Sequence, residues 1–324
     1  MLFSTLAALV LAEAGLRLAV HVGVPRILAD PGRYANPLSD DAYWILRAKG
    51  GLQPPLRRHT EHEQDPLLGW VPDRRNLNPM GGWQSPRFPE GTTETVAVFG
   101  DSFVFGTVGD GERLPDHLQA ALTGTRVLNY GVAGYGLDQI TARFDERLGV
   151  LERAAARVVV GILTTDLDRC LLTVRSGPKP TVRADGSLDP TRRSDLDQSH
   201  DTFFARARGP VSLVAALVRR SLTPVDAHRP QVERVGKAVL ERLDGLCRQA
   251  VACQLVVFEG PEEVVRQPGW RVEMIAEHTT APMWLARDAL GTEPLRSYGA
   301  DRHLNAQGNR TVARALAELL GPPR

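Results

Sequence analysis

The chain has 324 residues, of which 43% are hydrophobic and 24% are charged, as in globular proteins with a sizeable core. Its 39 basic and 38 acidic residues leave a net charge of +1, and no basic block indicates a nucleic-acid partner. Its three cysteines, Cys170, Cys247 and Cys253, are too few for a disulfide scaffold and match no zinc-binding spacing. A Cys247–Cys253 pair would form in an oxidising compartment, but two free thiols are the favoured expectation.

The first segment, residues 1–24, is predicted to be an apolar helix that anchors the chain in a membrane. Residues 2–24 are long enough to cross a bilayer, although Glu13 and Arg17 interrupt them at a spacing that allows an ion pair. The rest of the chain would then face the extracytoplasmic side. Because charges are costly in lipid, a helix lying on the domain or on a membrane surface is the alternative. A cleaved signal peptide is disfavoured, since the start is not basic and no cleavage site is clear.

The second segment, residues 25–94, is rich in Pro, Gly, Arg and Asn and shows little periodicity. It predicts an ordered but irregular arm that leads into the main domain. Within it, residues 65–70 (DPLLGW) predict a local turn with apolar anchors. Trp70 and Trp83 are expected to pack the arm on the main domain.

The main domain, residues 95–324, alternates short apolar runs with amphipathic stretches. Such alternation predicts βαβ units and a parallel sheet covered by helices on both faces, a three-layer α/β/α sandwich. Strands are predicted over residues 95–99, 126–129, 157–163 and 253–258. Helices are predicted over residues 112–122, 137–148, 231–250 and 305–320, the last with Asn305 as its N-cap.

An insertion of polar, Pro- and Gly-bearing sequence, at about residues 170–223, interrupts this alternation after the third strand. It is therefore expected to lie over the carboxyl edge of the sheet, where ligands bind in such folds. A substrate-covering loop and a mere surface excursion are equally compatible with its composition.

Two short patterns carry the chemistry. Ser102 directly follows the first strand, so its hydroxyl is expected at the sheet edge, beside a helix N-terminus that stabilises negative charge. Asp301 and His303 stand two residues apart, before the last helix. An aspartate at that spacing can orient the imidazole, so that the other ring nitrogen accepts a serine proton. The alternatives are helix caps at both places.

Together these motifs make residues 95–320 resemble the SGNH (GDSL-like) serine hydrolases. Gly100-Asp101-Ser102 matches the first block of that family, the glycine-rich turn at residues 129–136 matches the second, and D-x-H-x-N-x-x-G at residues 301–308 matches the closing block. The DPLLGW turn and the apolar N-terminus look like membrane-anchored bacterial members. The resemblance implies a flavodoxin-like sheet, Ser102, Asp301 and His303 as catalytic residues, and no metal or organic cofactor.

One block departs from the family pattern. The resemblance implies an oxyanion hole built from the N–H groups of Ser102 and Gly134 and from an asparagine after the third strand. In this chain the asparagine position falls on Thr165, which reaches less far, and Asp166 follows it. A carboxylate there would repel an oxyanion, and loss of one oxyanion donor typically costs about 10²–10³ in rate.

The function expected from this pattern is hydrolysis of carboxylic esters, of O-acetyl or short acyl type, through an acyl-enzyme on Ser102. The partner would be an ester-bearing small molecule, glycan or lipid. Two alternatives stay open: O-acyl transfer onto an extracytoplasmic glycan, and a non-catalytic domain that binds glycan or lipid. A nucleotide-binding domain is set aside, because Gly106, Gly109 and Gly111 do not form the GxGxxG spacing.

Overall fold

The computed structural model describes residues 2–21, 37–49, 62–84, 92, 94–154, 156–192, 196–208, 212–224, 227–265 and 269–321. Its strands are β1 (His62–Asp65), β2 (Gly69–Pro72), β3 (Glu94–Phe99), β4 (Thr125–Asn129), β5 (Arg157–Leu163), β6 (Thr181–Val182), β7 (Leu188–Asp189), β8 (Ala252–Phe258) and β9 (Met283–Leu285). Its α-helices are α1 (Leu2–His21), α3 (Asp41–Lys49), α4 (Ser102–Phe105), α5 (Leu114–Ala121), α6 (Leu137–Arg153), α7 (Asp166–Arg169), α8 (His200–Arg206), α9 (Leu213–Leu222), α10 (Arg229–Cys247), α11 (Trp270–Glu277), α12 (Arg287–Leu290) and α13 (Ala306–Leu320). Short 3-10 turns cover Pro37–Ser39, Arg74–Asn76, Pro190–Arg192 and Pro294–Ser297.

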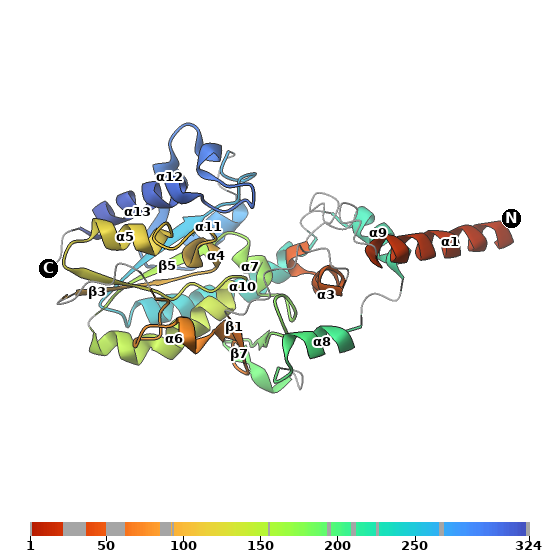
Figure 1. The fold of residues 1–324 in the computed structure, drawn as a ribbon, viewed down its shortest axis with the longest axis horizontal. Coiled ribbons are helices and arrows are strands. Elements are labelled where there is room, and N and C mark those ends of the chain that lie inside the picture. The colour runs from red at the N-terminus through yellow and green to blue at the C-terminus, as the bar shows by residue number, and fades with distance from the viewer. Residues whose placement is uncertain are drawn as a thin grey trace.

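The centre of the molecule is a five-stranded parallel sheet in the order β4-β3-β5-β8-β9. Helices cover both of its faces (Figure 1), so the predicted three-layer α/β/α fold is confirmed. The chain goes from β3 outward to β4 and then crosses back to β5, which makes the β3–β5 boundary the topological switch point. Ligands in open parallel sheets bind beyond the carboxyl ends of the strands at such a point.

The two faces of the sheet carry separate apolar cores because side chains alternate along each strand. In β5, Val158, Val160 and Ile162 pack with α6 and α10, whereas Val159 and Leu163 pack with α5 and α13. Both sets of strand residues are buried, which explains why the strand reads as a continuous apolar run rather than an alternating one.

The four predicted strands of the sheet agree with β3, β4, β5 and β8 to within a residue or so, and the last helix begins after Asn305 as predicted. The fifth strand, β9, was not predicted. It has three residues, all half-buried, too few to show the periodicity that identifies a strand.

The arm that precedes the sheet forms the hairpin β1–β2. Its turn is built as the sequence predicts: Asp65 Oδ1 accepts hydrogen bonds from the N–H groups of Leu67 (2.8 Å) and Leu68 (2.6 Å). Trp70 and Trp83 are buried and donate their indole N–H to the carbonyls of Ala133 (3.1 Å) and Gly131 (2.6 Å). The arm therefore holds the loop that follows β4.

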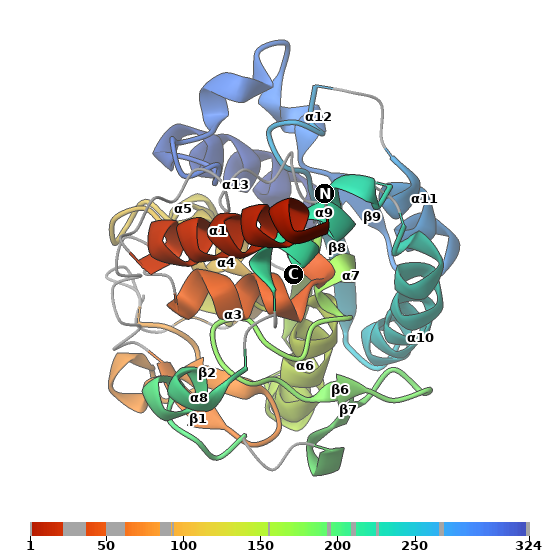
Figure 2. The ribbon, with the colours of Figure 1, turned by 90° about the vertical axis from the view of Figure 1, so that its right-hand side faces the viewer.

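The helix α3 and the insertion lie beyond the carboxyl ends of the strands, at the right of Figure 1 and toward the viewer in Figure 2. They share an apolar cluster of Tyr43, Trp44, Leu172, Val174, Phe203 and Phe204. Asp41 of α3 accepts hydrogen bonds from the Thr173 N–H (2.7 Å) and hydroxyl (2.5 Å). We call these segments, α3 with residues 170–192 and 196–208, the cap.

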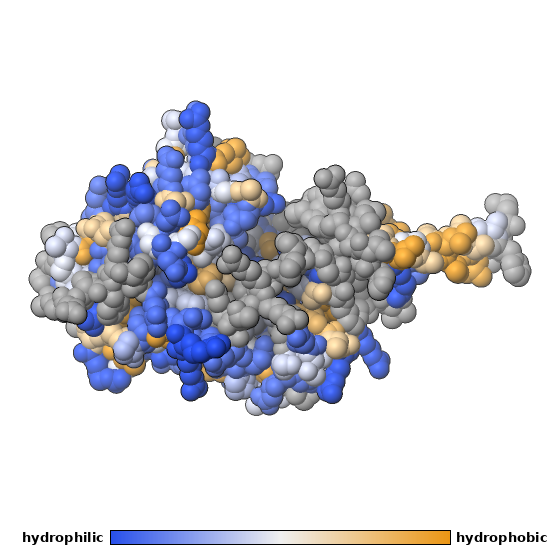
Figure 3. Space-filling model, in the orientation of Figure 1, coloured by the Kyte–Doolittle hydropathy of each residue, from blue (hydrophilic) through white to orange (hydrophobic). Residues whose placement is uncertain are grey.

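The N-terminal residues form α1, which extends away from the sheet (Figures 1 and 3) and contacts α9. Its apolar side chains are exposed to solvent, for example Leu6 at 61% and Leu11 at 72%. The predicted pair of Glu13 and Arg17 forms, at 2.7 Å. Over the described part of the chain, no helix combines the length and the hydropathy that crossing a membrane requires.

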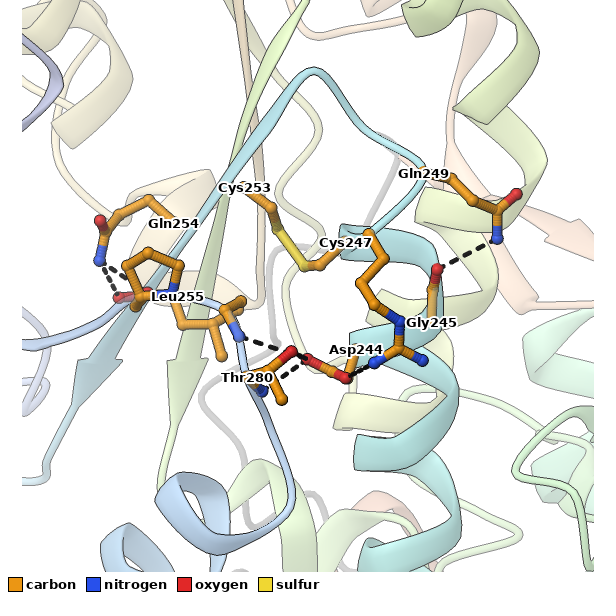
Figure 4. The surroundings of a disulfide bond; sticks show 11 residues. Asp244, Gly245, Cys247, Gln249, Cys253, Gln254, Leu255 and Thr280 are labelled. Carbon is orange, nitrogen blue, oxygen red and sulfur yellow. Dashed lines mark hydrogen bonds and ion pairs between the residues drawn. A yellow bond between two sulfur atoms is a disulfide. The ribbon is translucent and has the colours of Figure 1, made fainter.

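The cysteines differ from the favoured expectation of two free thiols. Cys247 is the last residue of α10 and Cys253 is the second residue of β8. The short connection between them brings their Cα atoms to 5.2 Å, and a disulfide joins the two side chains (Figure 4). That expectation is therefore wrong. Cys170 is buried and free.

Candidate active site

Ser102 stands where the sequence predicts, at the carboxyl end of β3. Asp101 is the N-cap of the short helix α4 and accepts a hydrogen bond from the Phe103 N–H at 2.8 Å. Ser102 is the first residue of that helix and is 7% exposed. The turn needs Gly100, because a Cβ there would lie 2.4 Å from Val104 Cγ2.

His303 and Asp301 reach Ser102 from the other end of the domain, although 201 positions separate the histidine from the serine. His303 Nε2 lies 2.8 Å from Ser102 Oγ, and His303 Nδ1 lies 3.3 Å from Asp301 Oδ2. The loop that carries them is fixed by Asn305, which accepts a hydrogen bond from the Gly308 N–H at 2.9 Å and so starts α13. The structure thus brings together the three residues of the predicted triad.

Asp301 is the more open member of this set. Its side chain is 53% exposed, and it accepts a hydrogen bond from the His303 N–H at 3.2 Å. Partial burial opposes ionisation, but hydrogen bonds from Thr107 and from His303 outweigh it and lower the pKa of Asp301. The residue is therefore an anion at neutral pH, as a group that stabilises an imidazolium must be.

Two backbone donors at the site are unused. Within the described part of the chain, neither the Ser102 N–H nor the Gly134 N–H makes a hydrogen bond. Ser102 N–H is free because the first N–H groups of a helix have no partner inside it. Gly134 has a φ of +87°, which a side chain would disfavour. Free N–H groups of this kind are the donors that hold an oxyanion in acyl transfer.

Thr165 lies at the same edge of the sheet, as the residue before α7. Among the described residues its hydroxyl makes no hydrogen bond to Ser102 or His303. The carboxylate of Asp166, expected to repel an oxyanion, is fully buried. It accepts hydrogen bonds from the Leu163 N–H, at 2.9 Å, and from Arg169. The carboxylate is therefore engaged by protein groups.

Arg169 is the residue of this site that sequence reasoning missed. Its Nη1 donates to Asp101 Oδ2 (2.7 Å), to the Tyr135 carbonyl (2.9 Å) and to Asp166. It therefore connects the turn of Ser102, the loop of Gly134 and the end of β5 through one buried cation. The only sequence signal for it was the Asp166–Arg169 spacing of three residues, typical of an ion pair on one helix face.

The charges of this network act on one another through a low-dielectric interior. Burial opposes the ionisation of Asp101, but Arg169 outweighs it and holds the pKa of Asp101 below its usual value. Burial and the nearby Asp101 carboxylate raise the pKa of Asp166 well above its usual value. Of the two carboxylates, Asp101 is thus the one that Arg169 keeps ionised next to Ser102.

Comparisons with known proteins place the chain near no established relative by sequence. No family model matches it, and no curated protein matches it.

Among solved structures, one similar chain is LAE5, an alpha/beta hydrolase enzyme from the metagenome of Lake Arreo, Spain, at 16% identity, with 71% of this chain and 95% of that chain covered and a TM-score of 0.41. Another is a catalytic mutant of Axe2, an acetylxylan esterase from Geobacillus stearothermophilus, at 19% identity, with coverages of 72% and 96% and a TM-score of 0.38. A third is a member of the lipolytic protein G-D-S-L family from Veillonella parvula, at 13% identity, with coverages of 69% and 96% and a TM-score of 0.37. These likenesses are too remote to assign a function, so the assignment rests on the geometry of the site itself.

Proposed function

We propose that this chain is a serine hydrolase of carboxylic esters, of the SGNH type that its motifs resemble. The observation that carries the proposal is the relay from Ser102 Oγ to His303 Nε2 at 2.8 Å and from His303 Nδ1 to Asp301 Oδ2 at 3.3 Å. A serine within hydrogen-bond reach of a histidine that an acidic residue orients is the arrangement that activates a hydroxyl nucleophile.

In the proposed mechanism, Ser102 Oγ attacks the ester carbonyl carbon while His303 Nε2 accepts the hydroxyl proton. Asp301 stabilises the imidazolium through Nδ1. The carbonyl oxygen becomes an oxyanion, which accepts hydrogen bonds from the free N–H groups of Ser102 and Gly134, with the Thr165 hydroxyl as the third donor. The tetrahedral intermediate then collapses, and His303 returns its proton to the leaving alcohol.

In a hydrolase, water resolves the acyl-enzyme: its oxygen attacks the acyl carbon while His303 takes one of its protons. The second tetrahedral intermediate then expels Ser102 Oγ, which regains the proton from His303, and the free acid is released. A sugar hydroxyl in place of water would make the same residues an O-acyltransferase.

The experiment that tests the proposal is labelling of the purified full chain with a fluorophosphonate, which reacts with activated serines. We expect covalent labelling of the wild type that is lost in Ser102→Ala. The matched control is Ser187→Ala, because Ser187 is a half-buried hairpin serine bonded to Asp185 and should leave labelling unchanged. A wild type that melts cooperatively but stays unlabelled would contradict the hydrolase proposal and leave the binding-domain alternative.

We also propose an extracytoplasmic location for the domain. The Cys247–Cys253 disulfide supports it, since such bonds persist in oxidising compartments. Thiol alkylation under denaturing, non-reducing conditions of the protein taken from its producing cells should modify Cys170 alone. Modification of all three cysteines would argue for a reducing compartment.

A further inference from the structure

Arg175, in the cap, is a cation without an anionic partner among the described residues. Its side chain is half-buried, and its Nη1 has no contact with water and no hydrogen-bond partner within the described part of the chain. Buried polar groups almost always have a partner, and an unpaired charged donor is especially costly. The described residues thus offer Nη1 no acceptor, and a bound anion would supply one.

The position of Arg175 points to the active site as the place where that acceptor binds. A Cβ built on Gly134 would lie 3.6 Å from Arg175 Nε and 3.0 Å from Ser176 Oγ. Gly134 carries one of the two free N–H groups of the site. The next residue, Tyr135, shares Arg169 with Asp101, which directly precedes Ser102. A group bound at Gly134 would thus lie beside the guanidinium.

The guanidinium is held in place by an aromatic ring rather than by hydrogen bonds. Arg175 Cζ lies 4.7 Å from the centroid of the Trp44 ring, and Trp44 is itself buried in the cap. Stacking of this kind orients the planar group and leaves its N–H edge available. Stacking uses none of the five guanidinium donors, so Nη1, which has no partner among the described residues, remains able to donate to an anion.

The surroundings of Arg175 favour an anion. Burial, and then the charge of Arg169, lower the pKa of Arg175 well below its usual value, and Arg47 acts in the same direction. Asp101 and Asp166 act against this shift, but both are already engaged by Arg169. An additional negative charge next to Arg175 would offset the cost of burying it.

We propose that Arg175 binds a carboxylate or phosphate group of the substrate, next to the ester bond that Ser102 attacks. This inference rests on the proposed esterase function, and it restricts the substrate class to esters that carry an anionic group near the scissile bond. Arg175 is a specificity-determining residue on this view, since it contacts the substrate but not the reacting carbonyl.

The test measures how small anions protect Ser102 from the fluorophosphonate. Labelling rates of the full chain are measured against increasing succinate, inorganic phosphate and the neutral analogue succinamide. The variants are Arg175→Gln, Arg175→Lys and, as the matched control, Arg183→Gln, because Arg183 lies in the same insertion but is paired with Asp189. Calorimetric titration of the same anions gives their affinity without using the chemistry of Ser102, and thermal melting shows that each variant is folded.

We expect succinate or phosphate to protect Ser102 of the wild type from labelling, and succinamide not to protect it. Whichever of the two anions protects more strongly indicates whether the substrate carries a carboxylate or a phosphate group. Arg175→Gln should weaken protection and binding by about 10- to 100-fold, Arg175→Lys by less, and Arg183→Gln not at all. Equal protection in the wild type and Arg175→Gln, or equal protection by succinamide, would overturn the inference. So would an Arg175→Gln variant that binds anions normally but labels at least about tenfold more slowly, which would make Arg175 an oxyanion donor.

Failure of this inference is distinguishable from failure of the proposed function. A wild type that is not labelled, yet binds succinate through Arg175 in calorimetry, would contradict the esterase and leave an anion-binding site. A labelled wild type that binds neither anion would retain the esterase and contradict the role of Arg175.

Discussion

Two carboxylates of this chain bind helix N-termini in opposite surroundings. Asp101 accepts a hydrogen bond from the Phe103 N–H at the start of α4 and is 1% exposed. Glu13 of α1 accepts hydrogen bonds from the Leu213 and Val214 N–H groups at the start of α9, both at 3.0 Å, from a side chain that is 22% exposed. The local chemistry is the same, since each carboxylate satisfies helix donors and favours the positive end of the helix dipole.

The two carboxylates differ in whether burial makes a counter-charge necessary. In the interior, the Asp101 carboxylate needs the buried guanidinium of Arg169, which in turn ties three loops of the active site together. At the surface, water screens Glu13, and its pair with Arg17 is a minor addition. A helix-capping carboxylate therefore becomes part of a larger network where it is buried, because a buried counter-ion must then balance its charge.

The largest expected effect is that of removing the buried cation. Arg169→Met would leave the ionised Asp101 carboxylate buried without a counter-charge, and such a loss typically costs about 3–5 kcal/mol in the free energy of unfolding. Denaturant melts would measure it. The matched control is Lys237→Met, which breaks an exposed pair with Glu241, whose side chains are 54% and 56% accessible to water, and should change stability by less than about 1 kcal/mol. Equal losses in the two variants would remove the distinction between buried and exposed charges.

A smaller effect is expected from Asp101→Asn, which removes the charge but keeps an oxygen that can accept from the Phe103 N–H. Arg169 would keep its hydrogen bonds to Asp166 and to the Tyr135 carbonyl, so the loss should be about 1–3 kcal/mol. Because the pKa of Asp101 is lowered in the folded state, the stability contributed by its charge is present above an unfolded-state pKa of about 3.9. It is lost as the pH falls below that value. The stability difference between wild type and variant should therefore shrink in acid, and a difference that does not change with pH would contradict this account.

The smallest effect is expected from Glu13→Gln, which should loosen α9 locally without changing the unfolding midpoint of the sheet domain. Hydrogen bonds from Leu213 and Val214 lower the pKa of Glu13 to about 2. Its contribution is thus present above the unfolded-state pKa, about 4.3, and is lost as the pH falls toward 2. Hydrogen exchange at the first amides of α9 should rise a few-fold in the variant at neutral pH, and in the wild type over that acidic range. If the exchange rates rise neither in the variant nor in the acidified wild type, Glu13 does not stabilise the start of α9.

The sequence by itself determined the elements that depend on local pattern. Four strands of the sheet, the helices between them and the N-cap at Asn305 follow from apolar periodicity and capping chemistry, which act over a few residues. Ser102, Asp301 and His303 were also predictable, because parallel topology brings the carboxyl ends of strands and the loop before the last helix to one edge. Departures arose where a signal was short or weak, as in the three residues of β9.

Only the tertiary structure decided the contacts between distant segments. Asp101 and Arg169 stand 68 positions apart, and nothing local to either residue specifies the other. Trp70 and Trp83 were expected to anchor the arm, but the carbonyls that they bind could not be named. The position of Arg175 beside Gly134, and the pairing of Cys247 with Cys253 against the favoured expectation, likewise depend on how the loops pack. Long-range contacts of this kind are set by the packing of the whole domain, because burial and charge balance are properties of the folded chain rather than of a residue type.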